Sequence, residues 1–490
     1  MDRATHFNWG EPAKMLNESS ARARLEENGQ DHVLRFWGEL SQTDRDTLIA
    51  QIETIDFRLM NRLIHQWVTS PPPEERFKRI DPVPVIPQGG GEDAQTAWQA
   101  GEEALRQGRV GLLLVAGGQG TRLGFDGPKG AYPIGPITGN SIFCYHAAKI
   151  RNLQSRYDCV LPWYIMVSEA NHATTKEFFR EQDYFGLNPK DVTFFQQRMV
   201  PCVDEQGKFM LEQPGKLAMN PNGHGGVIPA AMDNGISADT QNRGIDTLSY
   251  FQVDNWAVKV VDPLFIGYHV MRNGQMSSKN HRKRRPREPV GVHCICDGVY
   301  RVIEYTVLDM YPQLLETDSE GNLIHFAGNP AIHILDVGFI DSLNANYDNF
   351  PWWRAHKKIP YIDEKGERVK PDEPNGYKFE TFVFDALRFI THEPIALEIA
   401  REAEYTPIKS REGDNSVAAA RESMRNLWGG WLEKAGVPVS RDADGKVAVD
   451  IEISPLFALD EQEFLERAKG REYDATSGLA IGPEGDVETG

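Results

Sequence analysis

The stretch Leu113-Leu-Val-Ala-Gly-Gly-Gln-Gly-Thr-Arg-Leu-Gly-Phe-Asp-Gly-Pro-Lys-Gly130 combines an apolar run with a glycine-rich, basic loop. The apolar residues 110–116 predict a parallel strand that is buried on both faces. The glycines that follow let the backbone turn sharply and let its N–H groups approach an anion; they are Gly117, Gly118 and Gly120. Arg122 and Lys129 come next, and their cations suit the oxygens of a polyphosphate. The stretch therefore predicts a phosphate-binding loop at the end of a buried strand.

This loop matches neither of two common phosphate-binding motifs. The P-loop pattern fails because no Gly-Lys-Ser/Thr closes it. The dinucleotide fingerprint fails because Gly118-x-Gly120 is followed by Gly124, one residue late. A glycine-rich turn after a strand is also common in tight connections. The function therefore has to be inferred together with the rest of the chain.

Strands and helices alternate after this loop. Strands are expected over 163–168, 192–195 and 248–253, and a helix over 174–182. This alternation predicts an α/β fold with a mostly parallel sheet and helices on both faces. Gln196-Gln197 and Asp254-Asn255 each follow a strand, as the glycine loop does. We expect one cleft beyond the carboxyl ends of the strands to collect all three.

The composition excludes several classes of protein. The chain has 490 residues, enough for more than one domain, and a formal net charge of −18. Such a charge disfavours nucleic acid or an anionic membrane as a partner. No apolar run reaches about 18 residues and no apolar signal segment opens the chain, so a cytoplasmic protein is expected. The five cysteines lack metal-binding spacing and are expected to be reduced.

One basic segment, Lys279–Arg287, departs from the overall charge. A nuclear-localisation signal or an RNA-binding patch would account for it. A solvated edge strand or loop is favoured, because lysine and arginine there discourage strand pairing between molecules.

Three consecutive domains are expected: a helical N-terminal domain over 1–95, a catalytic domain over 96–400 and a C-terminal domain over 401–490. Local patterns predict further elements: helices over 30–40, 41–55 and 95–107, a β-hairpin with a primed turn over 291–305, a buried helix that begins within 376–385, a helix with Trp428 and Trp431, a strand over 447–453, a short helix near Glu461 and a frayed tail over 478–490.

Two further features have both a chemical and a structural interpretation. Asp254 at a strand end offers the hard oxygen that Mg²⁺ prefers, and capping of the next helix explains it equally well. The second glycine-rich loop, residues 219–226, could be a surface turn. Its glycines on both sides of His224 would also let the backbone lie flat against a base or a sugar ring. No metal partner stands at helical spacing from His224, so it is not predicted as a metal ligand.

Taken in order, these motifs resemble those of the UDP-sugar pyrophosphorylase family, and most closely the UDP-N-acetylhexosamine pyrophosphorylases. The resemblance rests first on Gly-Gly-x-Gly-Thr-Arg-Leu-Gly with Pro128-Lys129, and it covers most of the chain, from near residue 30 to past residue 410. The other matching segments are 30–40, 163–167, 184–187, 194–197, 222–226, 253–255, 258–260, 262–263, 288–291, 297–300, 302–305, 328–329, 357–360, 374–376, 378–385 and 407–409.

The resemblance implies a Rossmann-like, GT-A-like nucleotidyltransferase fold with a central mixed sheet, a helical N-terminal region and a small α+β C-terminal domain. It also implies the activity of a Mg²⁺-dependent uridylyltransferase, which makes UDP-N-acetylglucosamine and pyrophosphate from UTP and N-acetylglucosamine 1-phosphate. We expect small-molecule substrates, no nucleic acid or membrane partner, and a monomer or weak homo-oligomer.

The same resemblance assigns roles to residues of this chain. Catalytic cations would be Arg122, Lys129 and Lys409. Nucleotide-binding residues would be Gly117, Gly118, Gly120, Thr121, Gln196, Gln197, Gly223, His224 and Asp254, the last as the metal ligand. Sugar-binding residues would be Glu304, Tyr305, Asn329, Lys378, Phe382 and Phe384, with Lys378 also reaching phosphate.

Two departures concern the sugar. His224 stands where the acetylamino-sugar enzymes usually carry asparagine, and a Gly-His-Gly loop is similar to that of the UDP-glucose branch. Ile332 replaces an amide of the family pattern. Loss of a polar group near the sugar can shift the preference among hexoses. N-acetylglucosamine 1-phosphate is the first choice, and glucose, galactose or another hexose 1-phosphate is the alternative.

Two other functions would use some of the same residues. A glycosyltransferase could use Asp254 as its metal carboxylate, but this leaves Arg122 and Lys129 unexplained. A catalytically silent nucleotide-sugar sensor would not need to keep these charges.

Overall fold

The computed structural model describes residues 16–70 and 75–488, which form two compact units. The first unit comprises the described residues up to Glu75, together with Arg198–Gly226 and Pro351–Phe382. The second comprises Arg76–Gln197, Val227–Phe350 and the described residues from Val383 onward. This division groups the chain differently from the three consecutive domains expected from the sequence, whose boundaries stay a prediction.

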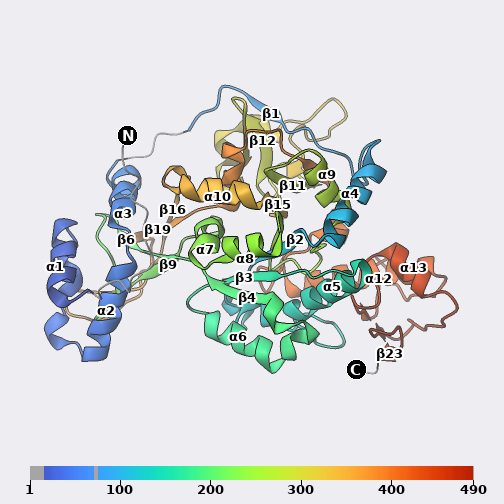
Figure 1. Cartoon of the computed structure of the whole chain (residues 1–490), viewed down its shortest axis with the longest axis horizontal. Coiled ribbons are helices and arrows are strands. Elements are labelled where there is room, and N and C mark those ends of the chain that lie inside the picture. Colours follow the sequence, from blue (N-terminus) through green and yellow to red (C-terminus); the bar gives the residue numbers. More distant parts are fainter. Residues whose placement is uncertain (1–15, 71–74, 489–490) are drawn as a thin grey trace. The chain divides into compact units, whose positions relative to one another are not determined.

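The second unit contains a large mixed sheet in which four neighbouring strands are parallel (Figure 1). The parallel order is β10 (Thr247–Gln252), β2 (Val110–Val115), β3 (Trp163–Val167) and β4 (Val192–Gln196). The sheet continues beyond β10 through antiparallel β15 (His333–Asp336) and β11 (Met276–Arg282). The predicted α/β fold with its parallel strands is therefore confirmed.

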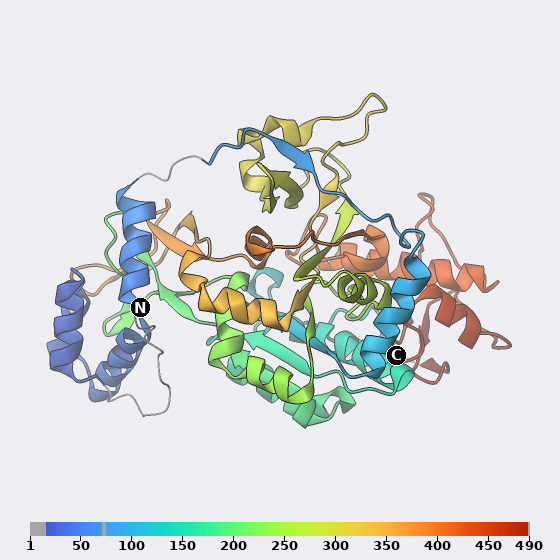
Figure 2. The ribbon, with the colours of Figure 1, turned by 45° about the horizontal axis from the view of Figure 1, so that its top comes forward.

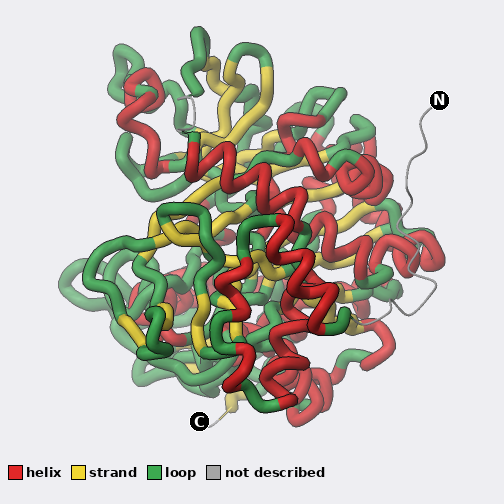
Figure 3. Tube along the Cα trace, turned by 90° about the vertical axis from the view of Figure 1, so that its left-hand side faces the viewer, coloured by secondary structure: helices red, strands yellow, loops and turns green. Residues whose placement is uncertain are grey.

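The remaining elements of this unit complete the sheet, cover it or form the C-terminal part. The strands are β1 (Ile80–Pro82), β12 (Val292–Cys296), β13 (Val299–Ile303), β14 (Ala327–Gly328), β20 (Ala396–Glu398), β21 (Ile451–Ile453), β22 (Leu479–Ile481) and β23 (Val487–Glu488). The helices are α4 (Ala94–Arg106), α5 (Ile142–Tyr157), α6 (His172–Glu181), α7 (Val227–Asp233), α8 (Ile236–Arg243), α9 (Pro263–Met271), α10 (Val337–Ala345), α11 (Arg401–Glu404), α12 (Val417–Lys434) and α13 (Glu461–Arg467). Figure 3 distinguishes the helices from the strands by colour.

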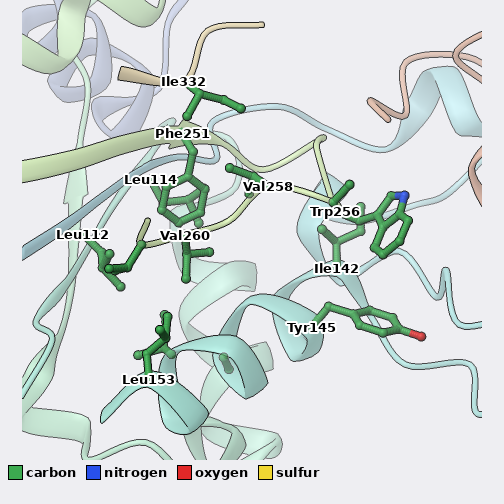
Figure 4. Packing of buried hydrophobic residues seen from close by; sticks show 14 of the residues in the cluster. Leu112, Leu114, Ile142, Tyr145, Leu153, Phe251, Trp256, Val258, Val260 and Ile332 are labelled. Carbon is green, nitrogen blue, oxygen red and sulfur yellow. The ribbon is translucent and has the colours of Figure 1, made fainter. Parts of the chain in front are cut away.

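The core lies between the parallel strands and the helices that cover them. Leu112 and Leu114 of β2 and Phe251 of β10 pack in one apolar cluster with Ile142 and Leu153 of α5 (Figure 4). Leu112 and Leu114 are fully buried, as expected for a strand covered on both faces.

Helices α4 and α9 lie side by side in Figures 1 and 2. Their small residues explain the close approach, because a Cβ at Gly267 would lie only 1.6 Å from the carbonyl oxygen of Ala97. A larger residue at this crossing would push the two helices apart.

Several local predictions are confirmed. Ser41 caps α2 (Gln42–Thr54) by accepting a hydrogen bond from the N–H of Asp44. Strands β12 and β13 form the predicted hairpin, and Asp297 and Gly298 at its turn both have positive φ, as a primed turn requires. The predicted helices over 95–107 and around Trp428 and Trp431 correspond to α4 and α12.

Three local predictions are wrong in whole or in part. Residues 30–40 form two short 3₁₀ turns rather than one regular helix. Residues 376–380 form a strand, because they pair with residues 353–357, and the predicted buried helix begins only at Val383, as the 3₁₀ helix Val383–Phe389. The described part of the expected frayed tail contains β22 and β23, and β22 pairs in parallel with β21.

The interpretation of the basic segment as an edge strand or solvated loop is wrong for its first half. Residues 276–282 form β11, which has neighbours on both sides in the sheet. Lys279 is fully buried, and its Nζ lies 2.6 Å from Oδ2 of Asp262. Arg284 and Arg285, which follow the strand, are paired with the acidic Glu402 and Asp414.

The first unit combines short helices with small antiparallel sheets. Its helices are α1 (Glu18–Glu27), α2 and α3 (Phe57–Ile64). Its strands are β5 (Met199–Pro201), β6 (Val203–Asp204), β7 (Leu211–Gln213), β8 (Lys216–Leu217), β9 (Met219–Pro221), β16 (Trp353–Lys357), β17 (Tyr361–Ile362), β18 (Arg368–Val369) and β19 (Gly376–Glu380).

Two global expectations concern cysteines and membranes. All five cysteines are free thiols. Within residues 16–70 and 75–488, no helix is both long enough and apolar enough to cross a membrane.

Candidate active site

The glycine loop follows β2 and closes on itself through backbone hydrogen bonds. The N–H of Gly120 donates to the carbonyl of Gly127 over 2.8 Å, and the N–H of Lys129 donates to that of Gly118 over 3.1 Å. These bonds fix the backbone of the loop that carries Arg122 and Lys129.

Two residues that the sequence did not single out support this loop. Asn171 Nδ2 donates to the carbonyl oxygen of Ala116 over 2.9 Å, and Ser168 Oγ donates to that of Gly117 over 2.9 Å. Asn171 Oδ1 in turn accepts from the N–H of Ser168. The signal in the sequence was Ser-x-x-Asn directly after a strand, a pattern in which short polar side chains bind nearby backbone.

Lys129 and Asp254 come together from the ends of two neighbouring parallel strands. Lys129 Nζ lies 3.9 Å from Oδ2 of Asp254, and the side chains are only 16% and 12% exposed. This confirms that the glycine loop and the end of β10 meet at one edge of the sheet, as expected for parallel strands.

The segment after α11 is bound to the same edge. The N–H of Ile408 donates to the carbonyl of Asp254 over 2.8 Å. Asn255 binds both sides of this segment, since its Nδ2 donates to the carbonyl of Glu404 and its Oδ1 accepts from the N–H of Thr406. Asp254 does not cap the next helix, α9, because the N-cap of that helix is Asp262. Its backbone is bonded to the C-terminal segment instead.

Lys409 lies next in this segment, in the field of several acidic groups. Desolvation disfavours its charge, but Tyr405, Asp254, Tyr305 and Glu304 together raise the pKa of Lys409 above the ordinary lysine value. Lys409 therefore stays a cation and shares the neighbourhood of Asp254 with Lys129.

Glu304 lies in the field of this cation, and Asn329 is bonded to Gly291, where an added Cβ would lie 3.3 Å from Oε1 of Glu304. Burial raises the pKa of Glu304, Lys409 lowers it, and Asp385 raises it further, with a net rise above the ordinary value. Asn329 is 8% exposed, and its Nδ2 has no hydrogen-bond partner among the described residues. A buried amide donor without a partner indicates a place for a ligand oxygen. The third predicted sugar residue here, Tyr305, is 45% exposed.

The other predicted residues of this unit are placed as follows. Gln197 is buried with its amide beside Gly117, where an added Cβ would lie 3.3 Å from Nε2. Gln196, Thr121 and Arg122 are exposed. Phe384 is 5% exposed. Its role as a wall of the sugar pocket stays a prediction.

Four predicted residues belong to the first unit. The loop with Gly223 packs against the backbone at the end of β19, since a Cβ at Gly223 would lie 2.4 Å from the carbonyl oxygen of Thr381. The ring of His224 stacks on Phe382 with centroids 5.3 Å apart. Lys378 lies on β19 opposite Ala355. Within this unit the structure therefore brings Gly223, His224 and Phe382 together.

A divalent cation would have few protein ligands here. No group of three or more His, Cys, Asp or Glu side chains that could hold a metal occurs in the described part of the chain. Asp254 offers a carboxylate beside Lys129 at the end of the glycine loop, and a Mg²⁺ ion on a nucleotide takes most of its ligands from phosphate and water. The donor set fits Mg²⁺ that arrives with a triphosphate.

Two cavities lie away from these residues. One of about 270 Å³ is lined by Cys144, Arg151 and Glu452, among others. One of about 590 Å³ is lined by Trp98, Lys259 and others. None of the predicted site residues lines either cavity.

Known proteins are similar to this chain over nearly its whole length. The family model described as UTP–glucose-1-phosphate uridylyltransferase matches residues 64–418. The human UDP-N-acetylhexosamine pyrophosphorylase-like protein 1 is 35% identical over 94% of this chain and 97% of its own length. The UDP-N-acetylglucosamine pyrophosphorylase of Saccharomyces cerevisiae is 33% identical over 93% of this chain and 98% of its own.

A solved structure gives the same result for the fold. The uridine diphosphate N-acetylglucosamine pyrophosphorylase of Trypanosoma brucei superposes with a TM-score of 0.79 at 26% identity, covering 95% of this chain and 99% of that one. These similarities confirm the resemblance and the fold class expected from the motifs. The chain belongs to the UTP–glucose-1-phosphate uridylyltransferase family.

Proposed function

We propose that this protein transfers a uridylyl group from UTP to a hexose 1-phosphate, with N-acetylglucosamine 1-phosphate as the preferred acceptor and pyrophosphate as the second product. The observation that carries this proposal is the meeting of Lys129 and Asp254 within 3.9 Å, with the cation Lys409 in the field of the same carboxylate. Two cations and one hard carboxylate are the groups that a phosphoryl centre needs.

The reaction needs no protein nucleophile. An oxygen of the sugar phosphate attacks the α-phosphorus of UTP in line, and the bond from that phosphorus to the bridging oxygen of pyrophosphate breaks. Lys129 and Lys409 would stabilise the negative charge that develops during this displacement. The glycine loop, kept in shape by Ser168 and Asn171, would hold the triphosphate. Catalysis then consists of positioning and charge stabilisation.

Mg²⁺ is the proposed cofactor, and Asp254 is the residue that would hold it. When bound, the ion would neutralise phosphate charge and fix the conformation of the triphosphate. The carboxylate of Asp254 and the lack of a larger ligand cluster among the described residues support a metal shared with the substrate.

The similarity to the UDP-N-acetylglucosamine pyrophosphorylase of Saccharomyces cerevisiae supports the choice of N-acetylglucosamine. Asn329, with its unpaired Nδ2, and the carboxyl group of Glu304 would bind sugar hydroxyls. Ile332, which replaces an amide of the family pattern, is part of the apolar core (Figure 4). Its side chain therefore offers no polar group to a sugar. His224 remains the position most relevant to the choice between hexoses.

The cytoplasm is the proposed location.

The test is to incubate the purified chain with UTP, Mg²⁺ and each of a panel of hexose 1-phosphates, and to measure pyrophosphate. We expect the fastest release with N-acetylglucosamine 1-phosphate and none in the presence of excess EDTA. Asp254→Asn should need more Mg²⁺, whereas Asp372→Asn, at an exposed position outside the predicted site, should not. A glycosyltransferase or a sensor would release no pyrophosphate with any acceptor, and this result would reject the proposal.

His224→Asn, assayed on the best and second-best acceptors, tests the choice between hexoses. An unchanged ranking would remove His224 from the account of specificity.

A further inference from the structure

Arg411 lies against the glycine loop, although it is far from that loop in the sequence. An ideal Cβ built on Gly124 would lie 1.7 Å from Nη2 of Arg411 and 2.4 Å from its Cζ. The guanidinium group therefore occupies the space that a side chain at residue 124 would fill. Gly124 also has φ of +72°, so its backbone conformation and this contact both favour glycine.

Gly124 is part of the proposed phosphate-binding loop. It ends the 3₁₀ turn Thr121–Leu123, which carries Arg122. Arg122 and Gly124 are two residues apart, so Arg411 adds a second guanidinium group to the turn that already carries one. A polyanion bound at this turn would be attracted by both positive charges.

The guanidinium group of Arg411 is unpaired among the described residues. Within residues 16–70 and 75–488, its side chain makes no hydrogen bond and no ion pair, and it is exposed. Two acidic residues follow on its own loop: no ion pair joins Glu412 to Arg411 among the described residues, and Asp414 pairs with Arg285 over 3.4 Å. The guanidinium donors of Arg411 are thus available to a ligand at the loop.

The backbone around Arg411 is fixed on the same sheet edge as Asp254. The N–H groups of Lys409 and Ser410 both donate to the carbonyl of Asn415, which closes a short loop around Arg411. The preceding residue Ile408 is bonded to the carbonyl of Asp254. Arg411 therefore reaches the glycine loop from an anchored segment, a geometry that lowers the entropy cost of binding.

We propose that Arg411 is a further phosphate-binding residue, which binds the β- and γ-phosphates of UTP and the pyrophosphate product. Lys129 lies beside Asp254, and Lys409 is in the field of the same carboxylate. These three residues are proposed above to act on the α-phosphorus and to hold its metal. Arg411 lies at the turn with Arg122, so it is assigned to the other end of the triphosphate. A planar guanidinium group suits the paired oxygens of these phosphates. This inference rests on the proposed uridylyl transfer.

The first test compares nucleotides in direct binding. Titration calorimetry of wild type and Arg411→Ala with UTP, in the presence of Mg²⁺, should show about tenfold weaker binding for the variant, since exposed hydrogen bonds to charged groups lie at the lower end of their range. UMP lacks the β- and γ-phosphates, so its affinity should not change. Arg411→Lys keeps the charge and should recover part of the UTP affinity.

The second test uses kinetics in both directions. Arg411→Ala should raise KM for UTP and, in the reverse reaction, KM for pyrophosphate by about tenfold, with little change in KM for the hexose 1-phosphate. Arg180→Ala is the matched control, because Arg180 is exposed on α6 and pairs only with Glu177 among the ion pairs of the described residues.

The outcomes separate the inference from the function on which it rests. If wild type releases no pyrophosphate with any hexose 1-phosphate, the proposed function fails, and the comparison of UTP with UMP still tests Arg411. Equal losses for UTP and UMP, or unchanged UTP binding, would overturn the role of Arg411. So would a fall in kcat with unchanged KM for UTP and pyrophosphate, which would mark a merely structural contact.

Discussion

Lys129 and Asp254 form the closest charged pair of the candidate site, and both are mostly buried. Removing Lys129 would leave the developing charge of the displacement without its nearest cation. We expect Lys129→Ala to lower kcat by about 10²–10³-fold, as is typical for the loss of one stabilising group in a transition state. Pyrophosphate release at saturating UTP measures this.

Lys469→Ala, at an exposed position near the C-terminus, is the control and should leave kcat unchanged. Lys129→Ala with wild-type kcat would contradict the role given to Lys129.

Glu304 combines a proposed role in sugar binding with a cost in stability. Burial raises its pKa, so the folded state holds a proton more tightly than the unfolded state does. Its contribution to stability is therefore greatest below the ordinary glutamate pKa and is lost as pH rises through the raised value. Glu304→Gln removes this loss, because the amide does not ionise.

We expect Glu304→Gln to be at least as stable as wild type at pH 7 and to have a higher KM for the hexose 1-phosphate. Thermal melts at several pH values and steady-state kinetics check the two parts. A difference in stability between variant and wild type that is the same at pH 4 and at pH 7 would contradict the assignment of this pH effect to Glu304.

Three elements meet at one buried ion cluster. Lys279 on β11 contacts Asp262, the N-cap of α9, and Glu404 on α11, and Lys259 lies 3.5 Å from Glu404. The carbonyl of Glu404 also binds Asn255, next to Asp254. The cluster thus links the interior of the sheet to the segment that carries Lys409.

Replacing Lys279 by Met should leave two buried carboxylates without their shared cation. We expect a loss of about 3–5 kcal/mol in the free energy of unfolding, measured by urea denaturation at pH 7. Adding Glu404→Gln should recover part of the loss. Lys190→Met, at an exposed position, is the control.

The effect of Lys279→Met should depend on pH. Desolvation raises the pKa of Asp262, but Lys279 and Lys259 outweigh it and hold the pKa below the ordinary value. This stabilisation is present above the ordinary aspartate pKa and is lost as pH falls through the lowered one. The difference in stability between wild type and variant should therefore shrink in acid. A difference that stays constant down to about pH 3 would show that the charge of Asp262 is not involved.

At the scale of the whole molecule, surface composition favours a single chain in solution. The net charge is −18, and the exposed large hydrophobic residues include Trp98, Val160 and Met310 at separate positions along the described chain. A high net charge of one sign also opposes the association of identical molecules. We expect sedimentation to give one species of about 55.2 kDa at micromolar concentration. A stable dimer at physiological salt would contradict this.

The sequence by itself determined the features that depend on near neighbours. The apolar run before the glycines, the capped helix after Ser41 and the hairpin around Asp297 all follow from local chemistry. The meeting of Lys129 and Asp254 was also predictable, because parallel strands present their carboxyl ends at one edge. The motifs also identified the family.

Only the tertiary structure decided where distant segments pair. Lys279 is buried because Asp262 and Glu404 neutralise it, and Glu404 stands more than a hundred residues later. Residues 376–380 are a strand because residues 353–357 lie beside them. Arg411 reaches Gly124 because the backbone of Asp254 anchors its segment. Burying a charge or ordering a loop costs free energy, and distant partners offset that cost. Local sequence patterns do not show which distant residues will be these partners, so they cannot predict these contacts.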